Sequence, residues 1–361
     1  MDNAYVDLHQ FINADAHLKA TANNLFLLAT NEVYDIDVSA IKKKLEFYKI
    51  KHGIGYNTHL LILNSWYKKY NKKFKKLKIN VVYVDLWLKY TYEKLFIEKL
   101  SAVRTKFCYN KNNSFLFMMG KFYRPNRIRL FYKLLEKNCI KENTFYTLRH
   151  NSHKKSFTTA LRLLDDVIKT KNDLKNFFTK YKKEIDVEYD ATIHTNELHY
   201  TGIPYNVNMF LNSNFQIIAE SSTSDEPVLL TWITEKTWIS IANKMPFILV
   251  GGKHSCLYLE NLGFKTFREY MKYPDYDEHD NLDTILDQVV ENVQYWEYNL
   301  HKFKDNIEND VEHNFRVFED RYFAYLKTQD YICKNYNIDK NFLNTDILNG
   351  YINHYPVKTI A

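Results

Sequence analysis

Along residues 215–267 the pattern of apolar and polar positions changes its period at each expected element. A run of β-type apolar residues at 215–219 stops at Glu220. After a polar loop, apolar side chains recur at the spacing of a helix with one buried face, at Trp238, Ile241, Ala242 and Met245. A second apolar run at 247–250 is closed by two glycines, as in a fully buried strand. We therefore expect a strand, a helix and a second strand in this order.

The same pattern continues towards the C-terminus. We expect a short helix that ends at Gly263 and a further strand at 264–267. Strands and helices that alternate in this way are typical of a parallel sheet, which binds ligands at the carboxyl ends of its strands. Apolar positions between 285 and 296 predict a long helix, and another helix is expected from about 300 to 325.

In the N-terminal half, apolar runs predict strands at 25–29, 79–84, 114–119 and 145–148. Residues 60–63 fit either a strand or a helix. The segment 68–78 contains seven lysines with aromatic residues between them. Such a run usually forms a solvated helix face, and contact with nucleic-acid phosphates or a membrane surface is the alternative.

The helix that follows the polar loop begins with side chains suited to a nucleotide. Thr234 occupies the N-cap position, so Glu235 and Lys236 lie in the first turn. A helix N-terminus offers unpaired N–H groups and a partial positive charge, which favour a diphosphate, and Lys236 adds a full charge. Glu235 can accept hydrogen bonds from a pair of ribose hydroxyls. The alternative is a capping box with a solvated lysine.

Two arginines give a second candidate for phosphate binding. Arg124 and Arg127 flank the start of the helix that follows the strand at 114–119. A guanidinium group matches the oxygens of a phosphate or of an acidic acceptor. A charged first turn at the protein surface is the alternative.

Composition narrows the classes of protein. A chain of 361 residues with 45% hydrophobic residues has enough material for two domains. The net charge of +7 fits an anionic substrate and permits nucleic acid as a partner. Four scattered cysteines without a C-x-x-C pair favour neither a zinc site nor a disulfide framework.

Two expected absences follow from the sequence. The acidic loop 275–280 could attract a divalent cation, but adjacent carboxylates on a loop are usually solvated, so no metal is expected. We also expect no signal peptide, because Asp2, Asp7, Asp15 and Lys19 precede any long apolar run. No membrane span is expected either, because no apolar run reaches about 18 residues. The expected protein is soluble and cytoplasmic.

Three motifs can be compared with known families: ESS at 220–222, TEKTW at 234–238 and PFILVG at 246–251. Together they resemble the donor-binding segment of the α-1,3-fucosyltransferase family and of a related group of viral and bacterial glycosyltransferase-like proteins. The resemblance implies that Glu235 holds the donor ribose and Lys236 the diphosphate, and that Glu220 faces the donor sugar or nucleotide.

Other segments match the related group less closely. Arg124, Pro125 and Arg127 correspond to an arginine-containing segment of that group, and residues 312–314 also resemble it. Within the latter segment, His313 is expected to be structural. Residues 243–245 depart from the small residue and glycine that are usual in fucosyltransferases, so the donor sugar stays open.

The resemblance implies a GT-B fold, in which two Rossmann-like α/β domains face one another across a cleft. We expect an N-terminal acceptor-side domain at 1–150 and a connecting helical segment at 151–190. A C-terminal domain at 191–330 would bind the nucleotide-sugar, and a tail at 331–361 would pack back on the first domain.

The expected activity is transfer of a sugar from a UDP- or GDP-sugar to a glycan or another hydroxyl acceptor, with inversion implied by the resemblance. The leaving diphosphate would be stabilised by Lys236, by the helix N-terminus and by Arg124 or Arg127. A carboxylate at a strand end of the first domain would act as general base. The candidates are Glu32 and Asp85, followed by Glu93.

Two alternatives remain open. The lysine run and the net positive charge permit a DNA-modifying glycosyltransferase that acts on a hydroxylated base. A non-catalytic module with the same fold, which binds nucleic acid or glycan, is the alternative from another class.

Overall fold

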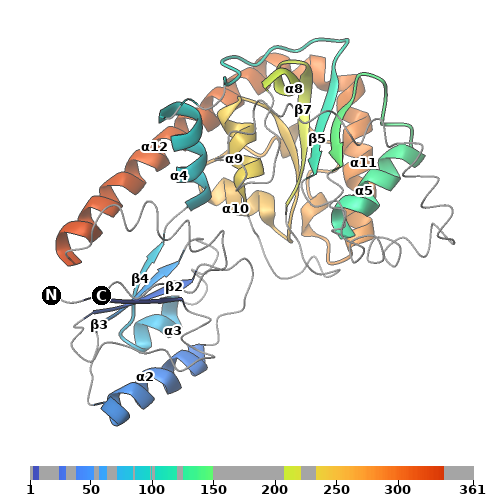
Figure 1. Cartoon of the computed structure of the whole chain (residues 1–361). Helices are drawn as coiled ribbons and strands as arrows, with labels where there is room; N and C mark the ends of the chain where they lie inside the picture. Colours follow the sequence, from blue (N-terminus) through green and yellow to red (C-terminus); the bar gives the residue numbers. More distant parts are fainter. Residues whose placement is uncertain are drawn as a thin grey trace. The chain divides into compact units, whose positions relative to one another are not determined.

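The computed structural model describes residues 3–7, 24–29, 38–52, 57–62, 71–83, 86–97, 99, 102–119, 125–148, 207–220 and 233–336, and the structural statements that follow concern these residues. The chain divides into two compact units, each with its own parallel β-sheet (Figure 1). The first unit comprises Met1–Lys89 and Arg321–Ala361, and the second comprises Tyr90–Asp320.

The first unit contains a four-stranded sheet in the order β1-β2-β3-β4. Its strands are β1 (Asn3–Asp7), β2 (Asn24–Ala29), β3 (Asn57–Ile62) and β4 (Asn80–Tyr83), all parallel. The strands at 25–29 and 79–84 are confirmed, and residues 60–62 belong to a strand. Helix α2 (Val38–His52) lies between β2 and β3 in the chain, and α3 (Asn71–Lys76) lies between β3 and β4.

The second unit contains a sheet in the order β6-β5-β7-β8. Its strands are β5 (Ser114–Met119), β6 (Phe145–Leu148), β7 (Ser213–Ala219) and β8 (Phe247–Val250), all parallel. The chain enters the sheet interior at β5, continues to β6 at one edge, returns to β7 beside β5, and ends at β8. This reversal makes a topological switch point between β5 and β7, the place where open α/β sheets bind ligands.

Helices cover both faces of the second sheet (Figure 1). Helices α5 (Pro125–Glu136) and α11 (Leu282–Asn299) pack together on one face. Helices α9 (Glu235–Ala242) and α10 (Ser255–Asn261) lie on the other. Right-handed connections explain this division, because the crossovers that contain α5 and α9 run across the sheet in opposite directions.

The core of the second unit forms where the central strands meet the helices. Every side chain of β7 and β8 is buried, as expected for strands covered on both faces. The indole of Trp296 on α11 packs edge-on against Phe215 at a centroid distance of 5.1 Å. At the end of β8, a Cβ atom on Gly251 would overlap the side chain of Ser255, so the close approach of α10 favours glycine.

The remaining described elements are mostly helical. They are α4 (Leu86–Tyr92), the π-helix η2 (Glu93–Ile97), α8 (Val207–Leu211), the 3-10 helices η4 (Arg268–Tyr270), η5 (Tyr276–Glu278) and η6 (Leu300–Phe303), and α12 (Lys304–Tyr336). The helix expected at 285–296 is confirmed within α11. The helix expected from about 300 to 325 consists of η6 followed by the longer α12.

The strand expected at 264–267 is wrong. These residues are not part of either sheet, although Phe264 and Phe267 are buried as strand residues would be. The side-chain amide of Asn314 on α12 takes the place of a neighbouring strand, because Oδ1 accepts from N–H of Lys265 at 2.7 Å and Nδ2 donates to its carbonyl oxygen at 2.9 Å. The apolar run 264–267 therefore forms a buried loop, which Asn314 of α12 holds in place.

The division of the chain differs from the expected ranges. The second sheet takes β5 and β6 from before residue 150 and β7 and β8 from after residue 206, so one compact unit spans the expected boundary. The expected connecting segment at 151–190 lies outside the described residues. Of the expected tail, residues 331–336 are described and continue α12.

Candidate functional site

The candidate site lies at the topological switch point of the second sheet. Glu220 directly follows β7, and α5 and α9 begin next to the carboxyl ends of β5 and β7. Two helix N-termini therefore converge where the strand order reverses. This placement could not be deduced from the local sequence pattern, because it depends on the pairing of β5 with β7.

The predicted N-cap of α9 is confirmed. Thr234 has extended backbone angles, and its Oγ1 accepts a hydrogen bond from N–H of Lys236 at 3.5 Å. The helix begins at Glu235, so Glu235 and Lys236 lie in its first turn as expected. All three side chains are buried.

The carboxylate of Glu220 connects the end of β7 to the first turn of α9. Its Oε1 accepts from N–H of Thr234 at 2.9 Å and from the hydroxyl of Thr237 at 2.6 Å. Its Oε2 accepts from the hydroxyl of Thr234 at 2.5 Å. Both oxygens of Glu220 are thus engaged with the helix N-terminus, where a negative charge is stabilised.

Lys236 folds back over the beginning of its own helix. Its Nζ lies 3.0 Å from Oε1 of Glu235, 3.1 Å from Oγ1 of Thr234 and 4.0 Å from Oε2 of Glu220. Lys236 is only 4% exposed, and Glu220 only 1%. Two carboxylates and one ammonium group therefore share a buried cluster, whose carboxylate oxygens can accept hydrogen bonds from the hydroxyls of a ligand.

Residues of α5 approach the same cluster from the other side of the switch point. Nδ2 of Asn126 donates to the carbonyl oxygen of Glu220 at 3.0 Å, and Nε of Arg127 donates to that of Ala219 at 3.1 Å. Both side chains are buried. The Oδ1 atom of Asn126 has no hydrogen-bond partner among the described residues.

Asn126 was not singled out from the sequence, although it lies between Pro125 and Arg127 in the helix start that the sequence did indicate. The structure brings Glu220, Thr234, Glu235, Lys236 and Arg127 together. Glu93 lies in η2 of the second unit and follows no strand end.

Three predicted site residues lie outside the described part of the chain: Arg124, Glu32 and Asp85. Arg124 precedes α5 by one residue. Glu32 and Asp85 follow β2 and β4 in the sequence, and the carboxyl ends of these parallel strands lie at the same edge of the first sheet.

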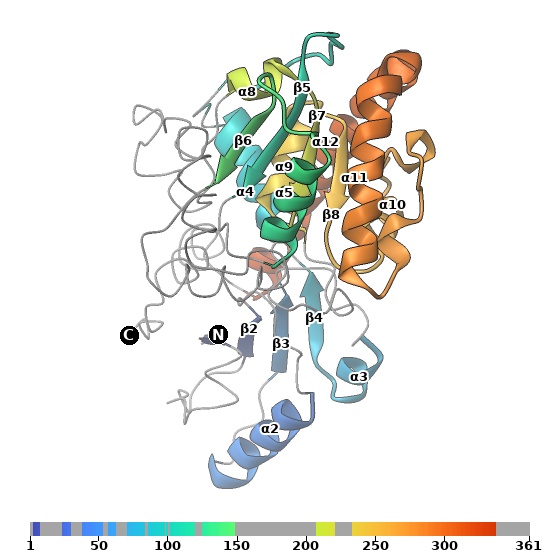
Figure 2. The same ribbon diagram turned by 90° about the vertical axis from the view of Figure 1, so that its right-hand side faces the viewer.

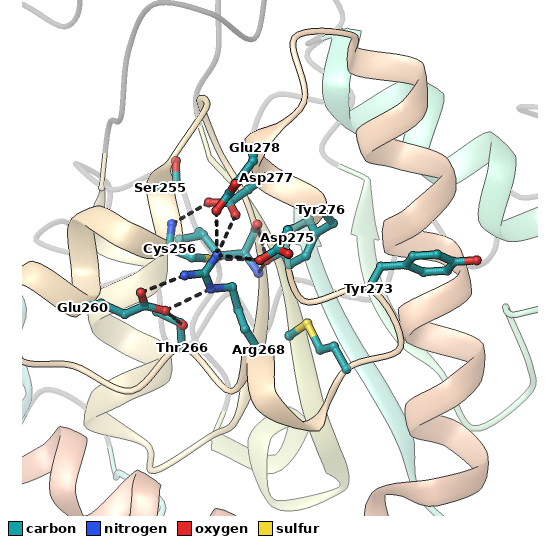
Figure 3. A network of polar contacts seen from close by, with 12 residues as sticks. Ser255, Cys256, Glu260, Thr266, Arg268, Tyr273, Asp275, Tyr276, Asp277 and Glu278 are labelled. Atoms are coloured by element: carbon teal, nitrogen blue, oxygen red, sulfur yellow. Dashed lines mark hydrogen bonds and ion pairs between the residues drawn. The ribbon is translucent and has the colours of Figure 1, made fainter.

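A second polar cluster surrounds Arg268 (Figure 3). Its Nη1 lies 3.5 Å from carboxylate oxygens of Asp277 and Glu278 and 3.8 Å from one of Asp275. Its Nη2 and Nε donate to the carboxylate of Glu260 at 2.8 and 2.9 Å. Three carboxylates of the acidic loop 275–280 are thus paired with an arginine, and the described residues contain no group of three or more side chains placed to hold a metal ion.

Burial and ion pairing shift the pKa values of this cluster in opposite directions. Burial raises the pKa of Asp277, whose Oδ2 accepts from N–H of Cys256 at the start of α10. Burial would also raise the pKa of Glu260, but the hydrogen bonds from Arg268 and Thr266 outweigh it and lower this pKa. The cluster fixes the loop to α10 and to η4, which is a structural role.

Comparison of the chain with protein-family models, with curated proteins and with solved structures finds no match. Among the described residues, no helix is both long enough and apolar enough to cross a membrane. The cluster at the switch point is therefore the feature of the described residues that points to a function.

Proposed function

We propose that the second unit binds a nucleotide-diphosphate sugar and that the protein is a glycosyltransferase, which transfers this sugar to a hydroxyl acceptor. The observation that carries the proposal is the buried cluster of Glu220, Thr234, Glu235 and Lys236 at the point where the strand order reverses. Ligands of open α/β sheets bind outside the strand ends at such a point.

The diphosphate would bind at the N-terminus of α9. The helix supplies N–H groups and a partial positive charge, and Lys236 supplies a full charge when it turns from Glu235 to the phosphate oxygens. Arg127 adds a buried guanidinium group on the opposite side of the switch point. As the bond to the sugar breaks, these groups would stabilise the negative charge that develops on the leaving diphosphate.

Glu235 would accept hydrogen bonds from the ribose hydroxyls. Once Lys236 contacts phosphate, the Glu235 carboxylate loses its ion pair and requires new hydrogen-bond donors, because a buried charge without partners is unfavourable. A ribose provides two such donors. Glu220 is already bonded to Thr234 and Thr237, so its part would be to hold the helix N-terminus towards the ligand.

The proposal has three further parts. The fold is of the GT-B type, the N-terminal side binds a glycan acceptor, and the transfer inverts the anomeric carbon. Glu32 and Asp85 are the candidate general bases, since each follows a strand whose carboxyl end lies at one edge of the first sheet. A hydroxylated base in DNA is the alternative acceptor, and a non-catalytic binding module is the alternative class.

Isothermal titration calorimetry with UDP, GDP, ADP and CMP tests the donor site directly. The informative variant is Lys236→Met, and the matched control is Lys244→Met, which removes a lysine just beyond the other end of the same helix, where it pairs with Glu312. We expect one nucleotide to bind the wild type and the control, and to bind Lys236→Met at least about tenfold more weakly because a charge-assisted bond is lost.

The result also distinguishes the alternatives. If no nucleotide binds the folded wild type, the transferase proposal is overturned and the binding module is favoured. If one binds, the corresponding nucleotide-sugars are incubated with glycans and with hydroxymethylated DNA, and release of the nucleotide identifies the acceptor class.

A further inference from the structure

Helices α2 and α3 lie on the same side of the sheet in the first unit (Figures 1 and 2). This follows from the strand order, because β2, β3 and β4 step across the sheet in one direction and right-handed connections then use one face. Each helix buries one apolar side chain completely, Ile41 on α2 and Phe74 on α3.

The outward faces of the two helices follow from these buried positions. Ile50 comes about two and a half turns after Ile41, so it points in the opposite direction. Lys72 and Lys76 lie two residues on either side of Phe74, and they also point away from its buried face. The outward faces of α2 and α3, opposite their buried residues, therefore lie on the same side of the first unit.

The outward side carries a high density of positive charge. We define the lysine face as Phe47 and Ile50 of α2 together with seven exposed lysines of α2, of α3 and of the turn after α3: Lys42, Lys43, Lys49, Lys72, Lys75, Lys76 and Lys78. The only acidic residue in α2 and α3 is Glu46, whose carboxylate lies 3.7 Å from Nζ of Lys42 in a solvent-exposed pair. Such pairs contribute little, so within α2 and α3 most of the positive charge is not neutralised.

Two large apolar side chains stand among these lysines. Ile50 is 85% exposed and Phe47 is 41% exposed. With Lys43 they form one stripe along α2, at a spacing of four and then three residues. An isoleucine this exposed gains free energy from any partner that offers an apolar environment.

We propose that the lysine face binds the surface of a membrane that contains anionic lipids. Lysines near such a surface are attracted by the negative head groups, while Phe47 and Ile50 enter the boundary between head groups and acyl chains. Double-stranded DNA would also neutralise the lysines, but its phosphate backbone gives Ile50 no apolar contact. The interaction lies in the first unit and does not depend on the proposed nucleotide site.

Flotation of the full chain with lipid vesicles tests this proposal. One set of vesicles contains phosphatidylcholine alone, and the other contains phosphatidylcholine with phosphatidylserine. We expect binding to the anionic vesicles only. The bound fraction should fall as salt rises, since the Debye length shortens from about 10 Å at 0.1 M to about 3 Å at 1 M.

Three double variants separate the contributions. Phe47→Ser/Ile50→Ser removes the apolar stripe, and Lys43→Glu/Lys49→Glu reverses two charges of the lysine face. Lys304→Glu/Lys327→Glu is the control, because it makes the same charge change at two exposed lysines of α12. All replaced side chains are exposed, and circular dichroism checks that each variant is folded.

Both lysine-face variants should lower the affinity for anionic vesicles by about tenfold or more, while the control binds like the wild type. The proposal is overturned if the wild type does not bind anionic vesicles, or if the apolar variant binds as well as the wild type. A third outcome would also overturn it: the wild type and the apolar variant bind double-stranded DNA equally well, neither binds the vesicles, and the charge-reversal variant no longer binds DNA. That outcome would assign the surface to nucleic acid.

Discussion

The hydroxyl of Thr234 donates a 2.5 Å hydrogen bond to Oε2 of Glu220, and the backbone N–H of the same threonine donates to Oε1 at 2.9 Å. One residue thus contacts both oxygens of a buried carboxylate fourteen positions earlier in the chain. The pair fixes the start of α9 to the end of β7, and the position of the proposed nucleotide site depends on it.

Replacing Glu220 with alanine should destabilise the second unit strongly. The change leaves the donors of Thr234 and Thr237 without an acceptor and removes one counter-charge of buried Lys236. We expect Glu220→Ala to lower the free energy of unfolding by about 3–5 kcal/mol, measured by urea denaturation followed by tryptophan fluorescence. Thr237→Val removes one hydrogen bond to a charged group and should cost about 1.5–3 kcal/mol. Equal losses in the two variants would contradict the central role of Glu220.

Asn314 should protect the loop 264–267 in place of a neighbouring strand. Asn314→Ala leaves the N–H and C=O groups of Lys265 without their partner, which we expect to cost about 1–3 kcal/mol. Hydrogen–deuterium exchange of a peptide that covers this loop should accelerate in the variant. His313→Ala is the control, because the bond of His313 to the carbonyl oxygen of Gly263 is exposed and its loss should change the free energy by less than about 0.5 kcal/mol. Unchanged exchange in Asn314→Ala would show that the amide is dispensable.

Two buried thiols should make the second unit less stable in alkali. Burial raises the pKa of Cys139 to about 12, and burial with the nearby charge of Asp277 raises the pKa of Cys256 well above its usual value. Above about pH 9 the unfolded chain loses these protons while the folded chain keeps them, so stability falls as pH rises, by about 1.4 kcal/mol per pH unit for each group.

Urea denaturation between pH 8 and about pH 11 measures this slope. The free energy of unfolding should fall less steeply with pH in Cys256→Ala than in the wild type. The two curves are compared after subtracting the difference in stability that the substitution itself causes at pH 8. Cys108→Ala is the matched control, since this cysteine is exposed and its replacement should leave the slope as in the wild type. If the free energy of unfolding falls equally steeply with pH in Cys256→Ala and in the wild type, the raised pKa of Cys256 is refuted.

Gln216 should tolerate an apolar replacement better than a charged one. Its side chain is fully buried in β7, and its Nε2 has no hydrogen-bond partner among the described residues. The hydroxyl of Ser240 donates to Oε1 of Gln216. Its Oγ also lies 2.9 Å from the carbonyl oxygen of Lys236, so this hydroxyl can donate to Lys236 instead.

Gln216→Met should therefore change the free energy of unfolding by no more than about 1 kcal/mol. Gln216→Glu should destabilise the protein by several kcal/mol at neutral pH, because it buries a charge. Thermal unfolding of both variants measures the difference, and a large loss in the methionine variant would show that the amide is essential.

Local patterns predicted the elements whose signals lie within a few residues. Thr234 was identified as the cap of α9 because threonine precedes an apolar helical period, and the strands at 215–219 and 247–250 were apparent from their continuous apolar character. The run at 264–267 has the same character, but the partner that decides its conformation is Asn314, about fifty residues away. No local pattern contains that information.

The candidate site was predicted only in part for the same reason. Glu235 and Lys236 could be placed in the first turn of a helix, and Arg127 near the start of another. That α5 and α9 meet at one switch point depends on the pairing of β5 with β7, which no local period specifies. The engagement of Glu220 with Thr237 and the contact of Asn126 with Glu220 depend on the same pairing.

The strand order of the second sheet also affects how the chain folds during synthesis. Ser114 of β5 pairs with Ser213 of β7, so roughly a hundred further residues must be synthesised after β5 before β7 can pair with it. At translation rates of about 5–20 residues per second, this interval is about 5–20 seconds. During that time one edge of β5 is unpaired and able to bind other chains. A nascent chain released before β7 would therefore be prone to aggregate, and a chaperone that covers β5 would act in this interval.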